Sequence, residues 1–320
     1  MTSPLSRLLL AGAFLALAAL PARAQVATVT DGSNLSNACR SFVVAAGGAV
    51  TLTPSGCLNL NTPPATTRLV NISTRMQVLT GENQLIGGFV IGGTTAKNVI
   101  VRARGPSLTA AGITNPLANP TLQLFSGQTV IASNDDWGAA ANAAAITASG
   151  FAPANAQEAA ILMTLNPGPY TAIVSGVGAT TGVGLVEVFE IDQTASPLVN
   201  ISTRGSVLTG DDVMIGGFVI QGTQQQTVLI RGLGPSLSAF GIASPLANPS
   251  IQLLSGATVL ATNDDWGQAA NAADITGTGQ APSNPLESAI LITLNPGPYT
   301  VIVSGVGGTT GVGLVEVFAR

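Results

Sequence analysis

The chain is 320 residues long, with 46% hydrophobic and 8% charged residues, and it contains 38 glycines. This composition excludes charge-driven disorder, because enough apolar surface is available to offset the entropy lost on folding. The 11 basic against 15 acidic residues and the lack of histidine make nucleic acid an unexpected partner and exclude Ser-His-Asp, Cys-His and most zinc chemistry.

Residues 1–24 are predicted to be a secretory signal peptide. Arg7 supplies a positive start, residues 8–20 form an apolar core, and Ala22-Arg23-Ala24 fits the small-x-small cleavage rule. The apolar run is shorter than the roughly 20 residues that span a bilayer. We therefore expect a secreted protein, extracellular or periplasmic, with no membrane span after leader removal.

The segment 25–67 follows the leader and carries both cysteines of the chain, Cys39 and Cys57. An oxidising compartment favours pairing them, and a loop of that size would contribute roughly 3 kcal/mol in the chain-entropy model. We expect a small disulfide-stapled segment. Two free thiols, or a metal site built on two cysteines without histidine, are the less favoured alternatives.

The rest of the chain is a gapless internal duplication. "LVNISTRMQVLTGENQLIGGFVIGG" returns 129 residues later as "LVNISTRGSVLTGDDVMIGGFVIQG", and 84 of the 121 positions from Leu69 to Phe189 are identical to their counterparts. The two copies must therefore share one fold. We place repeat 1 at 68–192 and repeat 2 at 197–320, with a connection short enough that the copies should pack close together.

Each repeat is predicted to be all β. Short aliphatic and β-branched runs such as "QLIGGFVI", "NVIVRARG" and "YTAIVSGV" are separated by Gly, Pro and Asn clusters, which is typical of strands and turns. Only "WGAAANAAAITASG" is compatible with a helix. About seven to nine strands per repeat, without helices of crossover length, indicate two tandem antiparallel β-sandwiches of jelly-roll-like type.

Both repeats place two adjacent carboxylates before a tryptophan, in "ASNDDWG" and "ATNDDWG". The oxygens of such a turn suit Ca²⁺, so we predict an optional calcium site. Its candidate ligands are Asn134, Asp135, Asp136, Asn263, Asp264 and Asp265. The alternative is that Asn and Asp cap their own backbone at the start of the Ala-rich segment, and the spacing is not that of a dedicated calcium loop.

The tryptophans of these turns, Trp137 and Trp266, allow two interpretations. Exposed rings would suit a carbohydrate site, whereas rings packed over the turn would be structural. Packing is favoured, because large aromatic side chains usually bury their rings.

Several charges recur in both copies within or beside apolar runs. Since a buried ion must be paired, we predict structural ion pairs among Arg75, Arg102, Glu158, Glu187, Arg204, Arg231, Glu287 and Glu316. No catalytic residue is assigned. The enzyme alternative is a glycoside hydrolase-like pair of carboxylates, Glu158 and Glu187, which would need a suitable separation within a cleft.

The stretches "LQLFSGQTVIASNDDWG" and "NPGPYTAIVSGVGATTGVGLVEVF" resemble bacterial pre-peptidase C-terminal domains. The resemblance covers roughly the last 70 residues of each repeat. It implies a secreted jelly-roll-like accessory module, sometimes calcium-binding, without catalysis of its own. The front half, with "LVNISTR" and "IGGFVI", looks like uncharacterised repeats of bacterial exported proteins.

The functional prediction is a secreted, non-enzymatic surface or matrix protein that acts by adhesion or self-assembly, optionally stabilised by calcium. Its expected partners are other surface or matrix proteins, or itself. A low-charge surface rich in Thr, Ala and Gly leaves few barriers to association. The alternatives are a carbohydrate-binding module, with polysaccharide as partner, and the hydrolase described above.

Overall fold

The computed structural model describes residues 41–44, 50–53, 67–192 and 195–320. The chain divides into a unit Met1–Ala65 and a unit Thr66–Arg320. In the first unit, β1 (Ser41–Val44) and β2 (Val50–Thr53) pair antiparallel. The predicted signal peptide 1–24 and the predicted Cys39–Cys57 disulfide lie outside the described residues.

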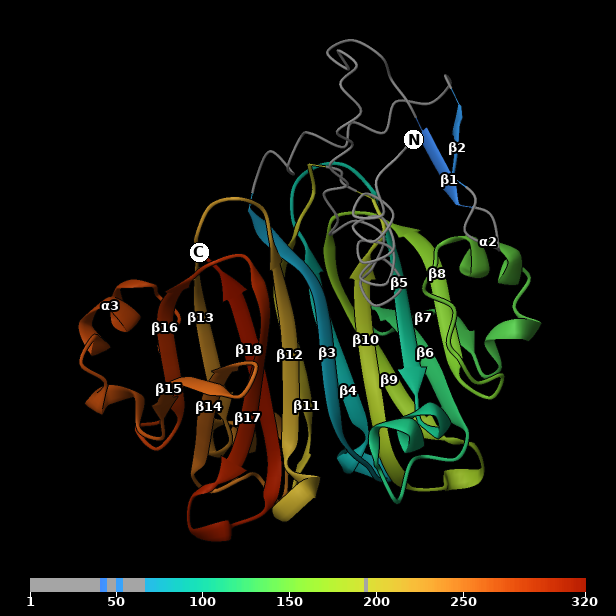
Figure 1. The fold of residues 1–320 in the computed structure, drawn as a ribbon. Helices are drawn as coiled ribbons and strands as arrows, with labels where there is room; N and C mark the ends of the chain where they lie inside the picture. The colour runs from blue at the N-terminus through green and yellow to red at the C-terminus, as the bar shows by residue number, and fades with distance from the viewer. Residues whose placement is uncertain (1–40, 45–49, 54–66, 193–194) are drawn as a thin grey trace, which may run out of the picture. The chain divides into compact units, whose positions relative to one another are not determined.

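Each repeat contributes eight strands and one short helix to the described part of the second unit (Figure 1). In repeat 1 these are β3 (Arg68–Val78), β4 (Leu85–Ile91), β5 (Lys97–Arg104), β6 (Pro120–Ser126), β7 (Thr129–Asn134), α2 (Ala143–Ala148), β8 (Ala159–Leu165), β9 (Gly168–Gly176) and β10 (Gly182–Glu190). In repeat 2 they are β11 (Leu198–Val207), β12 (Met214–Gln221), β13 (Gln226–Leu233), β14 (Pro249–Ser255), β15 (Thr258–Asn263), α3 (Ala272–Gly277), β16 (Ser288–Leu294), β17 (Gly297–Gly305) and β18 (Gly311–Ala319). The all-β prediction is confirmed.

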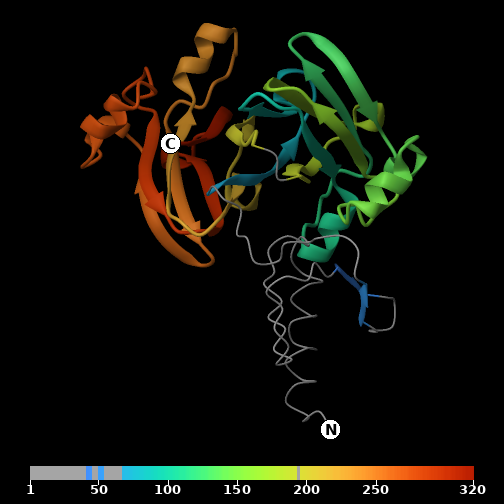
Figure 2. The same ribbon diagram turned by 90° about the horizontal axis from the view of Figure 1, so that it is seen from above.

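Hydrogen bonding arranges these strands in two antiparallel rows that both run through the two repeats. One row is β15-β14-β17-β12-β3-β10-β5-β8, and the other is β7-β6-β9-β4-β11-β18-β13-β16. Each repeat therefore forms a four-on-four, jelly-roll-like sandwich. Seen from above, the two sandwiches lie side by side (Figure 2).

The repeats are joined edge to edge in both rows, through β12 with β3 and β4 with β11. Paired glycines permit the close approach. A Cβ at Gly88 would lie 2.5 Å from the Oγ of Ser202, and one at Gly217 would lie 2.7 Å from the Oγ of Ser73. The "IGGF" stretch of each repeat thus accommodates a serine of the other repeat.

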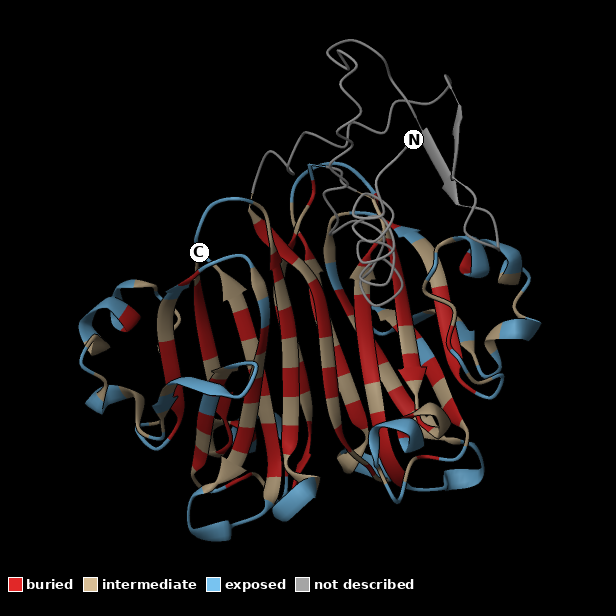
Figure 3. Ribbon diagram, viewed as in Figure 1, coloured by how far each residue is buried: buried red, intermediate tan, exposed pale blue. Residues whose placement is uncertain are grey.

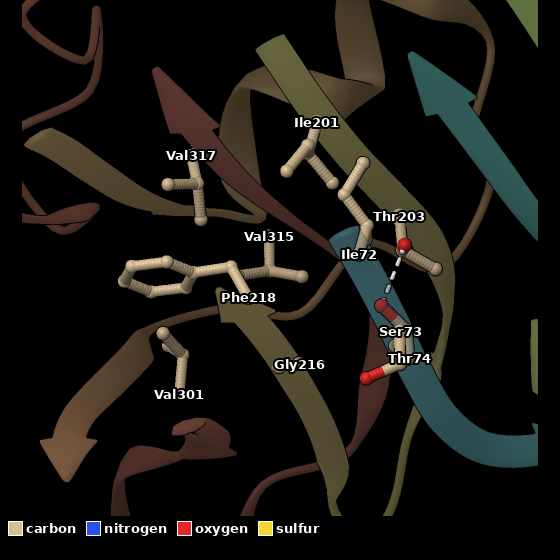
Figure 4. Close-up of a pocket in the computed structure, with 11 residues that line it drawn as sticks. Ile72, Ser73, Thr74, Ile201, Thr203, Gly216, Phe218, Val301, Val315 and Val317 are labelled. Carbon is tan, nitrogen blue, oxygen red and sulfur yellow. Dashed lines mark hydrogen bonds between the residues drawn. The ribbon is translucent and has the colours of Figure 1, made fainter. Parts of the chain in front are cut away.

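One hydrophobic core extends through both sandwiches. Buried and half-buried residues alternate along strands such as β4 and β12, as a sheet with one inward face requires (Figure 3). Where the repeats meet, Thr74 and its counterpart Thr203 hydrogen bond at 2.7 Å beside a cavity of about 10 Å³ (Figure 4). Among the described residues, no helix is long and apolar enough to cross a membrane.

Candidate functional site

The Asn-Asp-Asp-Trp segment binds the outer edge of strand β8. The Asn134 Oδ1 accepts a hydrogen bond from the backbone N–H of Ala160 at 2.8 Å, and its Nδ2 donates to the Asp136 carbonyl at 3.3 Å. In repeat 2, Asn263 makes the same contacts with Ala289 and Asp265 at 2.8 and 3.1 Å. The asparagine side chain thus stabilises its own turn and also supplies an acceptor for a backbone N–H on the outer edge of the strand.

Two further contacts of this segment complete the closure of β8. The backbone N–H of Trp137 donates to the Glu158 carbonyl at 3.0 Å, and the Asn142 Nδ2 donates to the Leu162 carbonyl at 2.9 Å. In repeat 2, Trp266 and Asn271 donate to Glu287 and Leu291, both at 2.9 Å. The backbone groups of an edge strand are a template for pairing with another chain, and here one outer N–H and one outer carbonyl of each of β8 and β16 are occupied.

The carboxylates after each asparagine differ between the repeats: Asp264 is exposed, whereas Asp265 is half-buried and its Oδ2 accepts a hydrogen bond from the Gln268 Nε2 at 2.8 Å. Asp135 and Asp136 are both exposed, beside a surface depression that Thr121, Gln123 and Ser133 also line. Partial desolvation, followed by the neighbouring Asp136 carboxylate, raises the pKa of Asp135. No group of three Asp, Glu, Cys or His side chains close enough to hold a metal occurs in the described part of the chain. Calcium at these turns stays a prediction.

Both tryptophans pack over a small hydrophobic cluster on the outside of the sandwich. Trp137 is half-buried against Ile100, Ile146 and Ala160, and its Nε1 donates to the Asn155 carbonyl at 3.1 Å. Trp266 packs in the same way against Leu229, Ile275 and Ala289. These contacts favour the packing interpretation, because the ring fastens the Ala-rich segment to the sheet.

Glu158 is fully buried and organises a backbone turn. Its Oε1 accepts hydrogen bonds from the N–H groups of Gly105 and Ser107, both at 3.0 Å, and from the Ser107 Oγ at 2.6 Å. Glu287 repeats this with Gly234 and Ser236. From the sequence, Glu158 is predicted to be a member of an ion pair or, in the enzyme alternative, one of two hydrolase carboxylates; its role as the acceptor of a turn is not predicted. The Gly-Pro-Ser tripeptide common to both repeats is the signal that could have indicated a turn needing an acceptor.

Arg102 and Glu187 form the ion pair that connects β5 with β10. The Arg102 Nη2 and Nε lie 2.6 and 3.0 Å from the Glu187 Oε2, and the guanidinium also contacts the Phe151 carbonyl and the Phe189 ring. Arg231 and Glu316 pair in the same way. Glu158 is enclosed, and neither Glu158 nor Glu187 lines the cavity where the repeats meet or the depression beside Asp135. The hydrolase alternative stays a prediction.

Arg75 and Arg204 differ from the expected ion-pair members. Arg75 donates to the Asp211 carbonyl at 3.4 Å, and the Nε of Arg204 is buried without a hydrogen-bond partner. Neither forms an ion pair with a carboxylate of the described residues. The reason lies in the register, because the cross-strand neighbours of Arg75 are Leu185 and Ile215 rather than acidic residues.

A buried ionic cluster occurs in repeat 1 alone and was not anticipated. The Lys97 Nζ lies 2.9 Å from both Glu190 Oε2 and Asp192 Oδ1, and the Arg68 Nη2 lies 2.8 Å from Glu190 Oε1. Burial raises the pKa of Glu190, an effect that Arg68 and Lys97 oppose. The cluster fastens the end of β10 to the start of β3 and β5. Repeat 2 has Pro197, Gln226 and Ala319 at the positions equivalent to Arg68, Lys97 and Glu190.

The comparisons with known proteins add little to this geometry. No family model and no curated protein matches the chain. A solved structure, the crystal structure of the major capsid protein P2 from bacteriophage PM2, is 8% identical, with 78% of this chain and 98% of that chain covered at a TM-score of 0.22. At that score the likeness carries no argument. The strands themselves place the chain in the class of tandem antiparallel β-sandwich proteins.

Proposed function

We propose that the chain is a secreted, non-enzymatic surface or matrix protein that acts by self-assembly. The observation that carries the proposal is the junction between the repeats, where two nearly identical modules pair edge to edge in both sheets. A module that already joins its own copy in this way is suited to extended assemblies. Secretion rests on the leader sequence.

The contacts of the duplicated polar residues support a structural role. Asn134 closes a strand edge, Glu158 holds a turn, and Glu187 pairs with Arg102. Each of these groups is engaged with the protein's own backbone or an arginine, whereas a catalytic group must be free to contact substrate. This argument favours scaffold over hydrolase, and the packed tryptophans favour it over sugar binding.

Sedimentation velocity of the purified mature chain, residues 25–320, tests the proposal. We expect the mean sedimentation coefficient to rise steadily with protein concentration, because each chain would join others through its exposed strands. A chain that stays monomeric from micromolar to millimolar concentration would contradict self-assembly.

Calcium is proposed as an optional ligand of the Asp carboxylates rather than as a requirement of the fold. Asn134 and Asn263 already use their amide oxygens on backbone N–H groups, and Asp265 accepts a hydrogen bond from Gln268. The exposed carboxylates of Asp135, Asp136 and Asp264 remain for an ion. A small ligand set of this kind is compatible with the weak, millimolar calcium binding of extracellular modules.

A further inference from the structure

Four strands end the two rows of the sandwich, and they are protected unequally. One row ends in β15 and β8, and the other row ends in β7 and β16. One outer N–H and one outer carbonyl of β8 are bonded by Asn134 and Asn142, and their counterparts do the same for β16. Within the described part of the chain, β7 pairs with β6 alone and β15 with β14 alone.

The two open strands also carry exposed apolar side chains. Val130 in β7 is 46% exposed, and Val259 and Leu260 in β15 are 49% and 41% exposed. Neither strand, "TVIASN" or "TVLATN", contains a charged residue or a proline, which are the usual means of preventing edge pairing. The nearest carboxylates, Asp135 and Asp264, follow the strands rather than lying within them.

We infer that β7 and β15 are the contact strands through which a second copy of this chain is added. The inference deepens the proposed self-assembly and depends on it. A second copy is the occupant that fits, because the two strands differ only at two conservative positions and are uncharged, so each can pair with either. The internal β12–β3 and β4–β11 pairs show that copies of this module pair along strand edges.

The positions of these strands determine the form of the assembly. β7 and β15 lie at opposite ends of the second unit (Figure 1). A molecule with one contact strand at each end forms open-ended chains, since no geometric closure is built in.

The strands are short, and a bulge between Leu124 and Phe125 leaves Ile131 of β7 without a partner in the ladder. Bulges and short edges weaken strand pairing. We therefore expect reversible association that requires a high local concentration, such as that on a surface, rather than irreversible aggregation.

The test uses the mature full chain and three lysine variants: Val130→Lys, the double variant Val259→Lys/Leu260→Lys, and the triple combination. A lysine on an edge strand opposes pairing by charge and hydration. In sedimentation velocity we expect either single-edge variant to stop at dimers and the triple variant to remain monomeric. The controls are Phe240→Lys and Val306→Lys, at positions outside both edges. Phe240, 79% exposed, is the most exposed large hydrophobic residue in the described part of the chain. Both controls should assemble like wild type.

The outcomes separate the two proposals. A triple variant that assembles like wild type overturns the assignment to β7 and β15 but leaves self-assembly standing. Loss of assembly in Phe240→Lys also overturns the assignment, because general hydrophobic attraction would then be the cause. A monomeric wild type overturns both. If circular dichroism shows that the lysine variants unfold, Val130→Thr/Val259→Thr/Leu260→Thr removes the apolar surface without adding charge, and association should weaken about tenfold.

Discussion

Repeat 1 and repeat 2 form the same eight strands in the same pairing, yet they contain different buried charges. Repeat 1 holds Arg68, Lys97, Glu190 and Asp192 in one cluster. It also has Arg104, which lies 3.7 Å from both Glu158 and Glu187. Repeat 2 places Leu233 at the position of Arg104 and lacks the cluster. Since both repeats fold alike, these charges are not required by the architecture.

The contacts that both repeats retain indicate what the architecture does require. Glu158 and Glu287 each hold a Gly-Pro-Ser turn, and Asn134 and Asn263 each close an edge strand. These side chains satisfy backbone groups that would otherwise be left without partners, and such groups are expensive to bury. The additional ions of repeat 1 lie where its last strand continues towards repeat 2, so we attribute to them a local fastening role.

The largest effect is expected from Glu158→Ala. The substitution leaves the buried N–H groups of Gly105 and Ser107 without an acceptor, and it should lower the free energy of unfolding by about 3 kcal/mol. Glu287→Ala should be less harmful, because the buried Glu287 carboxylate has Leu233 where Glu158 has the guanidinium of Arg104 at 3.7 Å, so removing Glu287 leaves no cation without its partner. Urea denaturation measures both. Equal losses of unfolding free energy in the two variants would contradict the larger role assigned to Glu158 than to Glu287.

The next effect is expected from Lys97→Gln, which introduces the residue found in repeat 2. It removes the ammonium between Glu190 and Asp192 and should lower the free energy of unfolding by about 3 kcal/mol, since breaking a buried ion pair leaves a carboxylate uncompensated. The matched control, Gln226→Lys, introduces the cation where no buried carboxylate has been placed. A stability change below about 0.5 kcal/mol for Lys97→Gln would show that the cluster is dispensable.

Glu316 is expected to have a smaller effect on stability, and this effect depends on pH. Burial raises its pKa above the usual 4.5, Arg231 opposes this, and the nearby Glu287 carboxylate adds to it. A raised carboxyl pKa means that the folded state binds the proton more tightly. The contribution of Glu316 to stability is therefore complete below pH 4.5 and is lost as the pH rises through the raised value.

Leu233→Arg tests this explanation by adding the guanidinium that repeat 1 has at Arg104. It should increase stability at neutral pH by about 1 kcal/mol and reduce the pH dependence assigned to Glu316. Thermal unfolding between pH 4 and 8 provides the measurement, with Glu316→Gln as the variant that removes the titrating group. An unchanged pH profile in Glu316→Gln would refute the assignment.

The edge closures should make about equal contributions in the two repeats. Asn142→Ala and Asn271→Ala each remove one hydrogen bond to an outer carbonyl of β8 or β16 and should lower the unfolding free energy by about 1 kcal/mol. They also expose a further strand edge, so we expect larger assemblies in sedimentation experiments. Smaller assemblies than wild type would contradict the protective role.

The smallest effect is expected from calcium. At about 1 mM Ca²⁺, binding with a Kd of about 1 mM at Asp135 and Asp264 should add only about 0.4 kcal/mol per site and raise Tm by about 2 °C. Calorimetric titration of wild type and of Asp135→Ala/Asp264→Ala separates specific binding from general salt effects. Identical heats in the two proteins would show that Asp135 and Asp264 do not bind calcium.

The amino-acid sequence alone was sufficient for the all-β class and the duplication, and it indicated that Arg102 and Glu187 belong to ion pairs without showing that they pair with each other. Alternating hydrophobicity reports which face of a strand is buried, and identical residues 129 positions apart in the sequence require one fold. Tertiary structure alone decided that the repeats share both sheets, that Glu158 bonds a turn about fifty residues earlier, and that Asn134 closes β8 and leaves β7 open. The physical reason is that strand pairing is non-local: side-chain periodicity predicts the buried face of a strand, whereas the strand's neighbour depends on contacts that form only when the whole sheet assembles.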